Sequence, residues 1–310
     1  MPTLKEIKGR ISSVKGTLKI TAAMKLVSSA KLRKAQKAIE AMRPYEARLQ
    51  SMLALVGGAP STESDPTVRG AAKIGSPSTE SASGVRGPVT AIVAIASNSS
   101  LCGGFNANAI AKVRSVRHAG DVVYSIGRKM ADAMRKDGFA SPEDFTALSD
   151  HPEYAPASAL VEKLLEEWQN GRFGQVLLVY NHFVSTARQE PVVEDLLAVL
   201  GERDTPFSAS LRDPVRANAP EGVSLSPDII IEPGKKELLE ILEPKVMKLK
   251  LYAALLDSAA AEHAARTVAM QTATDNGENL LQELTLQYNK GRQQKITSEI
   301  LDLAGGQAQE

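Results

Sequence analysis

The sequence is poor in the residues that build disulfides, metal sites and aromatic cores. Of its 310 residues, one is a cysteine, Cys102, and only 4% are aromatic. A single cysteine excludes an intrachain disulfide and a multi-cysteine zinc site, and is typical of a reducing compartment. Four histidines are scattered without metal-ligand spacing, so we expect no metal and no cofactor. Abundant alanine, leucine, lysine and glutamate instead favour long helices packed side by side.

Long apolar runs are absent as well. No stretch of about 18 uncharged apolar residues occurs, and residues 1–25 interleave lysine with leucine and isoleucine instead of forming the apolar core of a signal peptide. The sequence therefore predicts a soluble chain without a secretion signal.

Phosphate-binding glycine motifs are also missing. Neither GxxxxGK[ST] nor GxGxxG is present, and Gly103 and Gly104 are expected to make a tight turn between a strand and a helix. Cys102, with no base supplied by a neighbouring motif, is expected to be a small buried apolar residue. The chain by itself is not expected to be an enzyme.

The formal net charge of +1 conceals an uneven distribution. Residues 1–50 carry 12 Lys and Arg against 3 Asp and Glu, residues 51–233 carry 16 against 22, and residues 234–310 carry 9 against 11. A purely solvated basic face is the simplest interpretation, but an excess this large favours a partner of opposite sign. The face includes Lys5, Lys8, Arg10, Lys15, Lys19, Lys31, Arg33, Lys34 and Lys37.

Residues 1–56 predict one long helix. Thr3 and Glu6 have the spacing of a capping box, which places the helix start near Leu4. Apolar residues then recur every three or four positions, the pattern of a coiled-coil seam. The seam is interrupted by the polar residues Thr21, Lys25 and Ser28, and Pro44 is expected to bend or locally break the helix.

Residues 57–88 are rich in Gly, Pro, Ser and Thr and contain a 17-residue repeat, with Pro-Ser-Thr-Glu-Ser at 60–64 and again at 77–81. This composition cannot bury a core and indicates a duplicated surface insertion, with a phosphorylation or binding segment as the alternative.

Residues 89–233 predict a central α/β domain. Apolar strand patterns alternate with helical patterns, which is typical of crossover connections and a mostly parallel, Rossmann-like sheet. The expected strands are 89–96, 121–127, 175–181 and 228–232, the expected helices are 106–118, 129–136 and 155–169, and 204–227 is expected to be irregular.

Residues 234–310 return to the helical pattern, expected from about 235 to 304. Pro244 is expected to break or restart this helix, and Gly277 and Gly291 to cost about 1 kcal/mol each. Two long helices on either side of one domain can bury their seams on each other as an antiparallel coiled coil. The predicted fold class is therefore α/β, a rod standing on a globular foot.

Three groups of residues together resemble one family, the γ subunit of F-type ATP synthase, the central stalk of the F1 sector. They are residues 4–11 and 20–33 near the N-terminus, Leu-Cys-Gly-Gly-Phe-Asn at 101–106, and the C-terminal stretches 262–266, 273–276 and 283–300. The resemblance covers nearly the whole chain except the insertion.

The resemblance implies a rotor shaft, one copy per F1, that couples proton flow to ATP synthesis and is not itself catalytic. Its implied partners are the α, β and ε subunits and the membrane c-ring, with no nucleic acid and only indirect membrane association. The implied location is the cytoplasmic side of the bacterial inner membrane. Implied shaft contacts to the α/β hexamer are Met24, Lys25, Arg292, Gln293, Thr297 and Glu299. Implied foot contacts to the c-ring and ε are Arg43, Tyr45, Glu46, Ile229, Ile231 and Glu232.

Two other classes stay open at this point. A nucleotide-dependent enzyme built on the α/β domain would bind nucleotide as an isolated chain. A free-standing coiled-coil adaptor would bind acidic partners through its basic N-terminal helix in a salt-sensitive manner.

Overall fold

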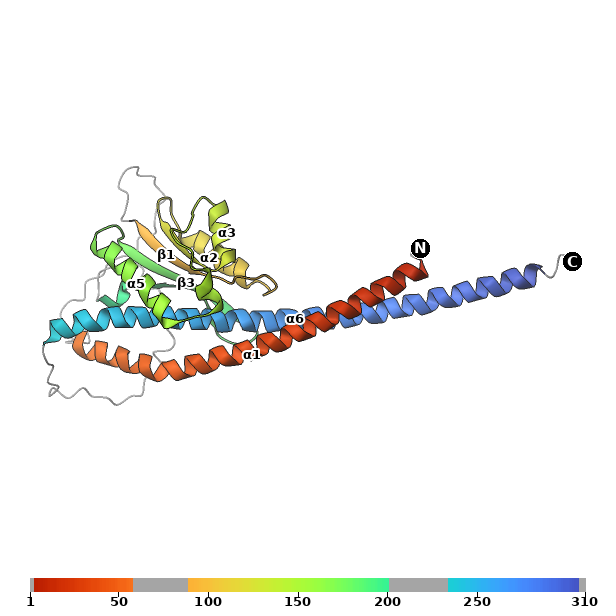
Figure 1. Cartoon of the computed structure of the whole chain (residues 1–310), viewed down its shortest axis with the longest axis horizontal. Coiled ribbons are helices and arrows are strands. Elements are labelled where there is room, and N and C mark those ends of the chain that lie inside the picture. Colours follow the sequence, from red (N-terminus) through yellow and green to blue (C-terminus); the bar gives the residue numbers. More distant parts are fainter. Residues whose placement is uncertain (1–2, 58–88, 201–233, 307–310) are drawn as a thin grey trace, which may run out of the picture.

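Two long antiparallel helices form a rod, and an α/β domain lies along one half of it (Figure 1). This computed structural model describes residues 3–57, 89–200 and 234–306. The rod consists of α1, Leu4–Gly57, and α6, Lys235–Gly306. The predicted fold class, paired terminal helices around a mostly parallel α/β domain, is confirmed. The insertion, the irregular stretch 204–227 and the strand expected at 228–232 lie outside the described residues.

α1 begins at the predicted residue because of its capping box. The Thr3 backbone N–H donates to Glu6 Oε2 at 3.1 Å, and the Glu6 N–H donates to Thr3 Oγ1 at 3.3 Å. These two bonds satisfy amides that have no partner within the helix.

Neither proline ends its helix, so the break expected at Pro244 and the local break allowed as one alternative at Pro44 do not occur. Pro44 lies inside α1 and Pro244 inside α6, and both helices continue through them. A proline inside a helix costs about 3 kcal/mol, whereas a fully buried large apolar side chain contributes about 1.5–3 kcal/mol. The cost is therefore offset by the cluster that joins the two helices at this level: Leu49, Val56, Leu242, Val246 and Leu249.

The seam between α1 and α6 continues through its polar positions. The expected interruption is one of polarity alone, because Thr21 and Ser28 are buried and Lys25 is half-buried at the next positions of the same register. Thr274 Oγ1 donates to Thr21 Oγ1 at 3.0 Å, and Lys25 Nζ donates to Gln271 Oε1. Polar side chains thus occupy the interface with their hydrogen bonds satisfied across it.

Two glycines of α6, Gly277 and Gly291, face leucines of α1. A Cβ added to Gly277 would lie 2.7 Å from Leu18 Cδ2, and one added to Gly291 would lie 3.2 Å from Leu4 Cδ2. The missing side chains leave room for the leucines, which gives these residues a packing role beside their cost in helix propensity.

Within residues 89–200, the domain contains four strands in the order β2-β1-β3-β4. They are β1, Thr90–Ile95, β2, Val122–Ile126, β3, Gln175–Phe183, and β4, Gln189–Asp195. β1 pairs in parallel with β2 and β3, while β4 is an antiparallel edge strand. β4 was not predicted, because Pro191 and its charged residues weaken the strand pattern, and an edge tolerates both.

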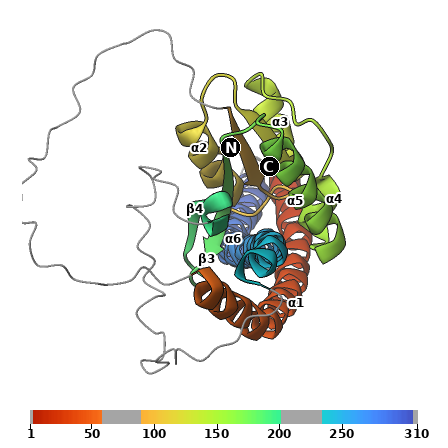
Figure 2. The same cartoon turned by 90° about the vertical axis from the view of Figure 1, so that its left-hand side faces the viewer.

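Helices cover both faces of the sheet (Figure 2). α2, Phe105–Val116, and α3, Arg128–Lys136, pack on one face; α5, Tyr154–Gln169, and α6 itself pack on the other. α1 lies on the far side of α6, so α6 runs between the sheet and α1. Two short elements, α4, Thr146–Asp150, and a 3₁₀ turn, Leu197–Leu200, were not predicted.

The glycine contacts predict different outcomes for the same substitution at two sites. Gly16→Ala, on the exposed side of α1 with nothing within 4 Å of an added Cβ, is expected to raise the free energy of unfolding by about 1 kcal/mol. Gly277→Ala is expected to gain less than half of this, because the new methyl meets Leu18. Urea unfolding of the purified chain followed by circular dichroism measures both; equal gains would contradict the packing role of Gly277.

Candidate functional site

The rod exposes apolar side chains near its middle. Ile20, Leu26 and Val27 on α1 and Val268 on α6 are exposed, Leu26 to 71%, and Met24 is exposed to 39%. We call these five residues the collar. None lies on the seam, since the seam positions in this region are Thr21, Lys25 and Ser28. Ile20, Met24 and Val27, at spacings of four and three, share one face of α1. Exposed apolar residues on one face are typical of a surface that binds a partner.

Two adjacent residues that the resemblance names as shaft contacts point in different directions. Met24 belongs to the exposed collar, whereas Lys25 lies at the interface and bonds to Gln271 of α6. Of the two, only Met24 therefore points mainly outward from the rod.

The end of α6 extends alone beyond α1 (Figure 1). α1 begins at Leu4, which packs beside Gly291, and every residue from 292 to 300 is exposed. Within this end, Thr297 Oγ1 donates to the Gln293 carbonyl at 2.9 Å, and Lys295 lies 3.7 Å from Glu299. Positions three and four apart share one face of a helix. That face holds the four residues the resemblance names together with two exposed apolar ones: Arg292, Gln293, Ile296, Thr297, Glu299 and Ile300.

At the opposite end of the rod, the named foot residues differ in exposure. Arg43 and Tyr45 are exposed, whereas Glu46 is half-buried at a seam position of α1. Desolvation and the nearby Glu194 carboxylate raise the pKa of Glu46, against the opposing effect of Arg43 and Lys250. Ile229, Ile231 and Glu232 lie outside the described residues.

The raised pKa makes Glu46 a destabilising group at neutral pH. Its ionised form is less favourable in the folded chain than in the unfolded chain, so Glu46→Gln is expected to raise the free energy of unfolding at pH 7.5. This gain is expected to fade as the pH falls through the raised pKa, because the native carboxyl is then protonated too. Urea unfolding at pH 7.5 and 4.5 checks the effect, with the exposed Glu40→Gln as control. A loss of stability at pH 7.5 would contradict it.

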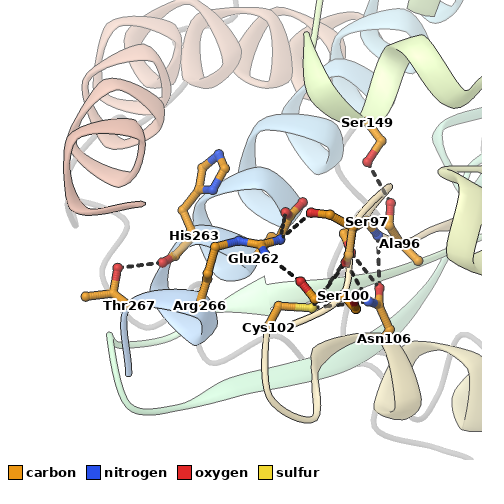
Figure 3. A network of polar contacts seen from close by, with 11 residues as sticks. Ala96, Ser97, Ser100, Cys102, Asn106, Ser149, Glu262, His263, Arg266 and Thr267 are labelled. Atoms are coloured by element: carbon orange, nitrogen blue, oxygen red, sulfur yellow. Dashed lines mark hydrogen bonds and ion pairs between the residues drawn. The ribbon is translucent and has the colours of Figure 1, made fainter. Parts of the chain in front are cut away.

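One arginine of α6 ties the loop after β1 to the rod (Figure 3). Arg266 Nη1 donates to the Ser100 carbonyl at 2.6 Å, and Nη2 donates to Ser99 Oγ at 2.8 Å and to Glu262 Oε1 at 2.6 Å. Burial raises the pKa of Glu262, and Arg266 only partly offsets this. The guanidinium thus bridges one turn of α6 to the loop by charge-assisted bonds.

The loop is held from inside as well. Ser97 N–H and Oγ both donate to Asn106 Oδ1 at 3.0 Å, and Asn106 Nδ2 lies 3.1 Å from Cys102 Sγ. Cys102 is buried among Phe105, Ala261 and Ala265, as predicted. Leu101 adopts a positive φ of 68° and exposes 58% of its surface. The loop is a rigid structural turn that presents Leu101 outward.

At the edge of the sheet where α/β proteins bind phosphate, the first amides of α3 already have partners within the chain. An open, polar hollow of about 800 Å³ lies at the carboxyl ends of β1 and β2. The first two amides of α3 are used within the chain: Arg128 N–H donates to Asn98 Oδ1 at 2.8 Å and Lys129 N–H to the Ser97 carbonyl at 3.1 Å. Because these donors are engaged, this helix start does not offer the free amides that a nucleotide phosphate needs.

His263, next to this network, is held neutral. Burial, Lys31 and Arg266 lower the pKa of His263 to about 4, and its Nδ1 has no hydrogen-bond partner among the described residues. The ring is therefore uncharged in the folded chain at pH 5 to 7.

This lowered pKa predicts a pH-dependent loss of stability. Between pH 6.5 and about 4 the unfolded chain binds a proton at this histidine and the folded chain does not, so stability falls as the pH falls. His263→Gln is expected to remove about 1 kcal/mol of that loss at pH 5. Thermal or urea unfolding at pH 7 and pH 5 measures it, and the exposed His118→Gln is the control. Identical pH slopes for wild type and His263→Gln would contradict the assignment.

Two further absences concern only the described part of the chain. Across residues 3–57, 89–200 and 234–306, no three His, Cys, Asp or Glu side chains come together as metal ligands. The same ranges contain no helix with the length and hydropathy needed to cross a bilayer.

Several contacts between the domain and α6 were missed in the sequence. Lys250, Asp257, Glu262 and Arg266 interrupt an apolar, alanine-rich stretch of α6, and all four bond to the domain or to one another. Charged residues at spacings of seven, five and four within such a stretch were the available signal. The domain partners of Lys250, Asp257 and Arg266 lie 55 to 167 positions away in the sequence.

The architecture is that of a stalk: a two-helix rod with an α/β domain at one end and a single helix at the other. The sequence profile described as ATP synthase matches residues 3–308. The ATP synthase gamma chain of Phocaeicola vulgatus is 42% identical over 315 residues, covering 99% of each chain, and that of Bacteroides thetaiotaomicron is 41% identical over 316 residues, covering both completely. The rotor structure of the Euglena gracilis mitochondrial ATP synthase shares the fold, with a TM-score of 0.57 at 18% identity, covering 94% of this chain and 98% of that one.

The chain belongs to the ATP synthase gamma chain family. It is a non-catalytic rotor subunit, the central stalk of F-type ATP synthase, and takes part in ATP synthesis and proton transport as a component of that complex. The resemblance drawn from the sequence is thereby confirmed, and the nucleotide-dependent enzyme and the free-standing adaptor are set aside.

Proposed function

We propose that the rod turns inside a ring of α and β subunits and transmits proton-driven rotation of the c-ring to the nucleotide sites of the β subunits. The observation that carries this proposal is the combination of an exposed collar and an unpaired α6 end on one rod. Both surfaces are exposed in the described chain.

The positive charge of α1 also supports a ring of α and β subunits as the partner of the rod. Within the described residues, no lysine or arginine of α1 forms an ion pair with a carboxylate, although lysines and arginines outnumber acidic residues fourfold in residues 1–50. An acidic surface around the rod would relieve the resulting repulsion. We place Met24, Lys25, Arg292, Gln293, Thr297 and Glu299 at this contact, with Lys25 acting mainly through the seam.

Rotation can drive the chemistry only if the rod favours different states of the surrounding subunits in turn. The rod is asymmetric in cross-section, because the collar has four residues on α1 and one on α6. Each β subunit then meets a different face at each angle, and its nucleotide affinity shifts with the conformation that this face stabilises. The foot, through Arg43, Tyr45, Glu46, Ile229, Ile231 and Glu232, contacts the c-ring and ε on the cytoplasmic side of a bacterial inner membrane.

Met24→Lys tests the placement of the collar. The new cation lies at an exposed position, so folding and assembly are expected to be retained while ATP-driven proton pumping falls at least twofold relative to ATP hydrolysis. The ratio is measured in inverted membrane vesicles with a fluorescent pH indicator and a coupled ATPase assay. Met24→Leu, which keeps size and apolarity, is the control. A normal ratio in Met24→Lys would remove Met24 from the contact.

A further inference from the structure

The foot is attached to the shaft by contacts of two kinds. Met247, Leu251, Ala254 and Leu255 of α6 belong to the apolar core under the sheet. Apolar burial holds surfaces together without specifying direction, whereas hydrogen bonds and ion pairs depend on geometry. The polar contacts therefore decide the angle at which the foot sits on α6.

Asp257 makes the first of these polar contacts. Its Oδ1 accepts the backbone N–H of Phe183 at 3.1 Å, and its Oδ2 lies 2.6 Å from His182 Nδ1. A single carboxylate on α6 thus holds the end of β3 through both a main-chain and a side-chain group, and only 18% of the Asp257 side chain is exposed.

Lys250 makes the second contact, on the neighbouring strand. Its Nζ donates to the Asp195 carbonyl at 3.1 Å and lies 3.0 Å from Glu194 Oε2. Tyr180 of β3 in turn donates its hydroxyl to Glu194 Oε1 at 2.7 Å. Burial alone would raise the pKa of Glu194, but Lys250 and Tyr180 reverse this and hold the pKa below its usual value. Glu46 of α1 faces this group, since both Glu194 and Lys250 act on its pKa.

The two contacts are placed so that together they resist rotation. Lys250 and Asp257 are seven residues apart, which puts them on one stripe of α6 about 10 Å apart along its axis. Their partners lie on β3 and β4, whose antiparallel pairing joins Phe183 to Gln189 and Leu177 to Asp195. Lys250 and Asp257 thus attach one side of α6 to two places on the paired strands β3 and β4. This double attachment resists both sliding of the foot along α6 and rotation of the foot about it.

We propose that Lys250 and Asp257 are positioning residues that fix the angle of the foot about α6, and so transmit torque from the foot to the shaft. This inference deepens the proposed function and rests on it. We call these two contacts the joint. When the joint is weakened, the foot can rotate about α6 under load, so one step of the c-ring turns the shaft by less than the full angle of that step.

The test uses the assembled enzyme in inverted membrane vesicles. Lys250→Met, Asp257→Asn and the double variant are compared for subunit content, ATP hydrolysis and proton pumping. We expect hydrolysis per assembled complex to stay within about twofold of wild type, and the pumping-to-hydrolysis ratio to fall at least twofold in the double variant. A purely structural role lowers subunit content and leaves the ratio unchanged, which would overturn the proposal.

A charge exchange keeps the test informative where a single variant fails to assemble. Lys250→Glu combined with Glu194→Lys re-forms the pair in reverse and is expected to recover at least half of the ratio lost in Lys250→Glu. Absence of recovery would also count against the proposal. Asp137→Asn is the matched control, because Asp137 pairs with Arg114 and Arg117 inside the foot and not with α6.

The outcome is separable from that of the proposed function. If Met24→Lys lowers the ratio in the same vesicles and the double variant does not, the rotor contact stands and the joint is refuted. If neither Met24→Lys nor the double variant changes the ratio, both the placement of Met24 at the rotor contact and the role of Lys250 and Asp257 are refuted.

Discussion

One helix, α6, is packed on two sides, and the rest of the structure depends on this. Its Met247, Leu251 and Leu255 complete the core beneath the sheet, while Ala260 and Ala264 receive Leu32 and Ala35 of α1. A helix buried on two sides needs small residues where its neighbours approach most closely, which accounts for the alanine-rich centre of α6. The foot has no complete core without α6, so foot and shaft form one folding unit although they are different parts of the machine.

Local sequence patterns predicted the structural features that depend on residues close together in the sequence. The capping box set the start of α1, and the heptad repeat predicted the apolar parts of the seam. The interruption expected at Thr21 and Ser28 is one of polarity only, because both residues are buried. A helix break at the prolines was expected because a proline in a helix interior costs about 3 kcal/mol. That expectation left out the tertiary packing that offsets the cost. β4 was missed for a related reason: pairing with β3 stabilises a sequence whose own strand preference is weak.

The candidate site divides in the same way. Exposure of Met24 and of residues 292–300 follows from helical periodicity, because these positions fall outside the seam or beyond the start of α1. Their assignment as contacts came from the family resemblance. The bonds of Arg266 to Ser100 and of Asp257 to Phe183 join residues far apart in the sequence, and no periodic pattern encodes such pairs. They become visible only once the chain is folded.

Gly291 and Gly277, which lie opposite Leu4 and Leu18, fix the register of α6 against α1 along the rod. The two leucines are fourteen residues apart, and so are Gly291 and Gly277, so both pairs match only in one alignment of the helices. A slip of one heptad would set Leu18 against Leu284 or Met270, both buried side chains too large to admit it. The unpaired end from 292 to 306, about 22 Å at 1.5 Å per residue, therefore has a fixed reach. Two residues without side chains thus set how far the shaft projects above the foot.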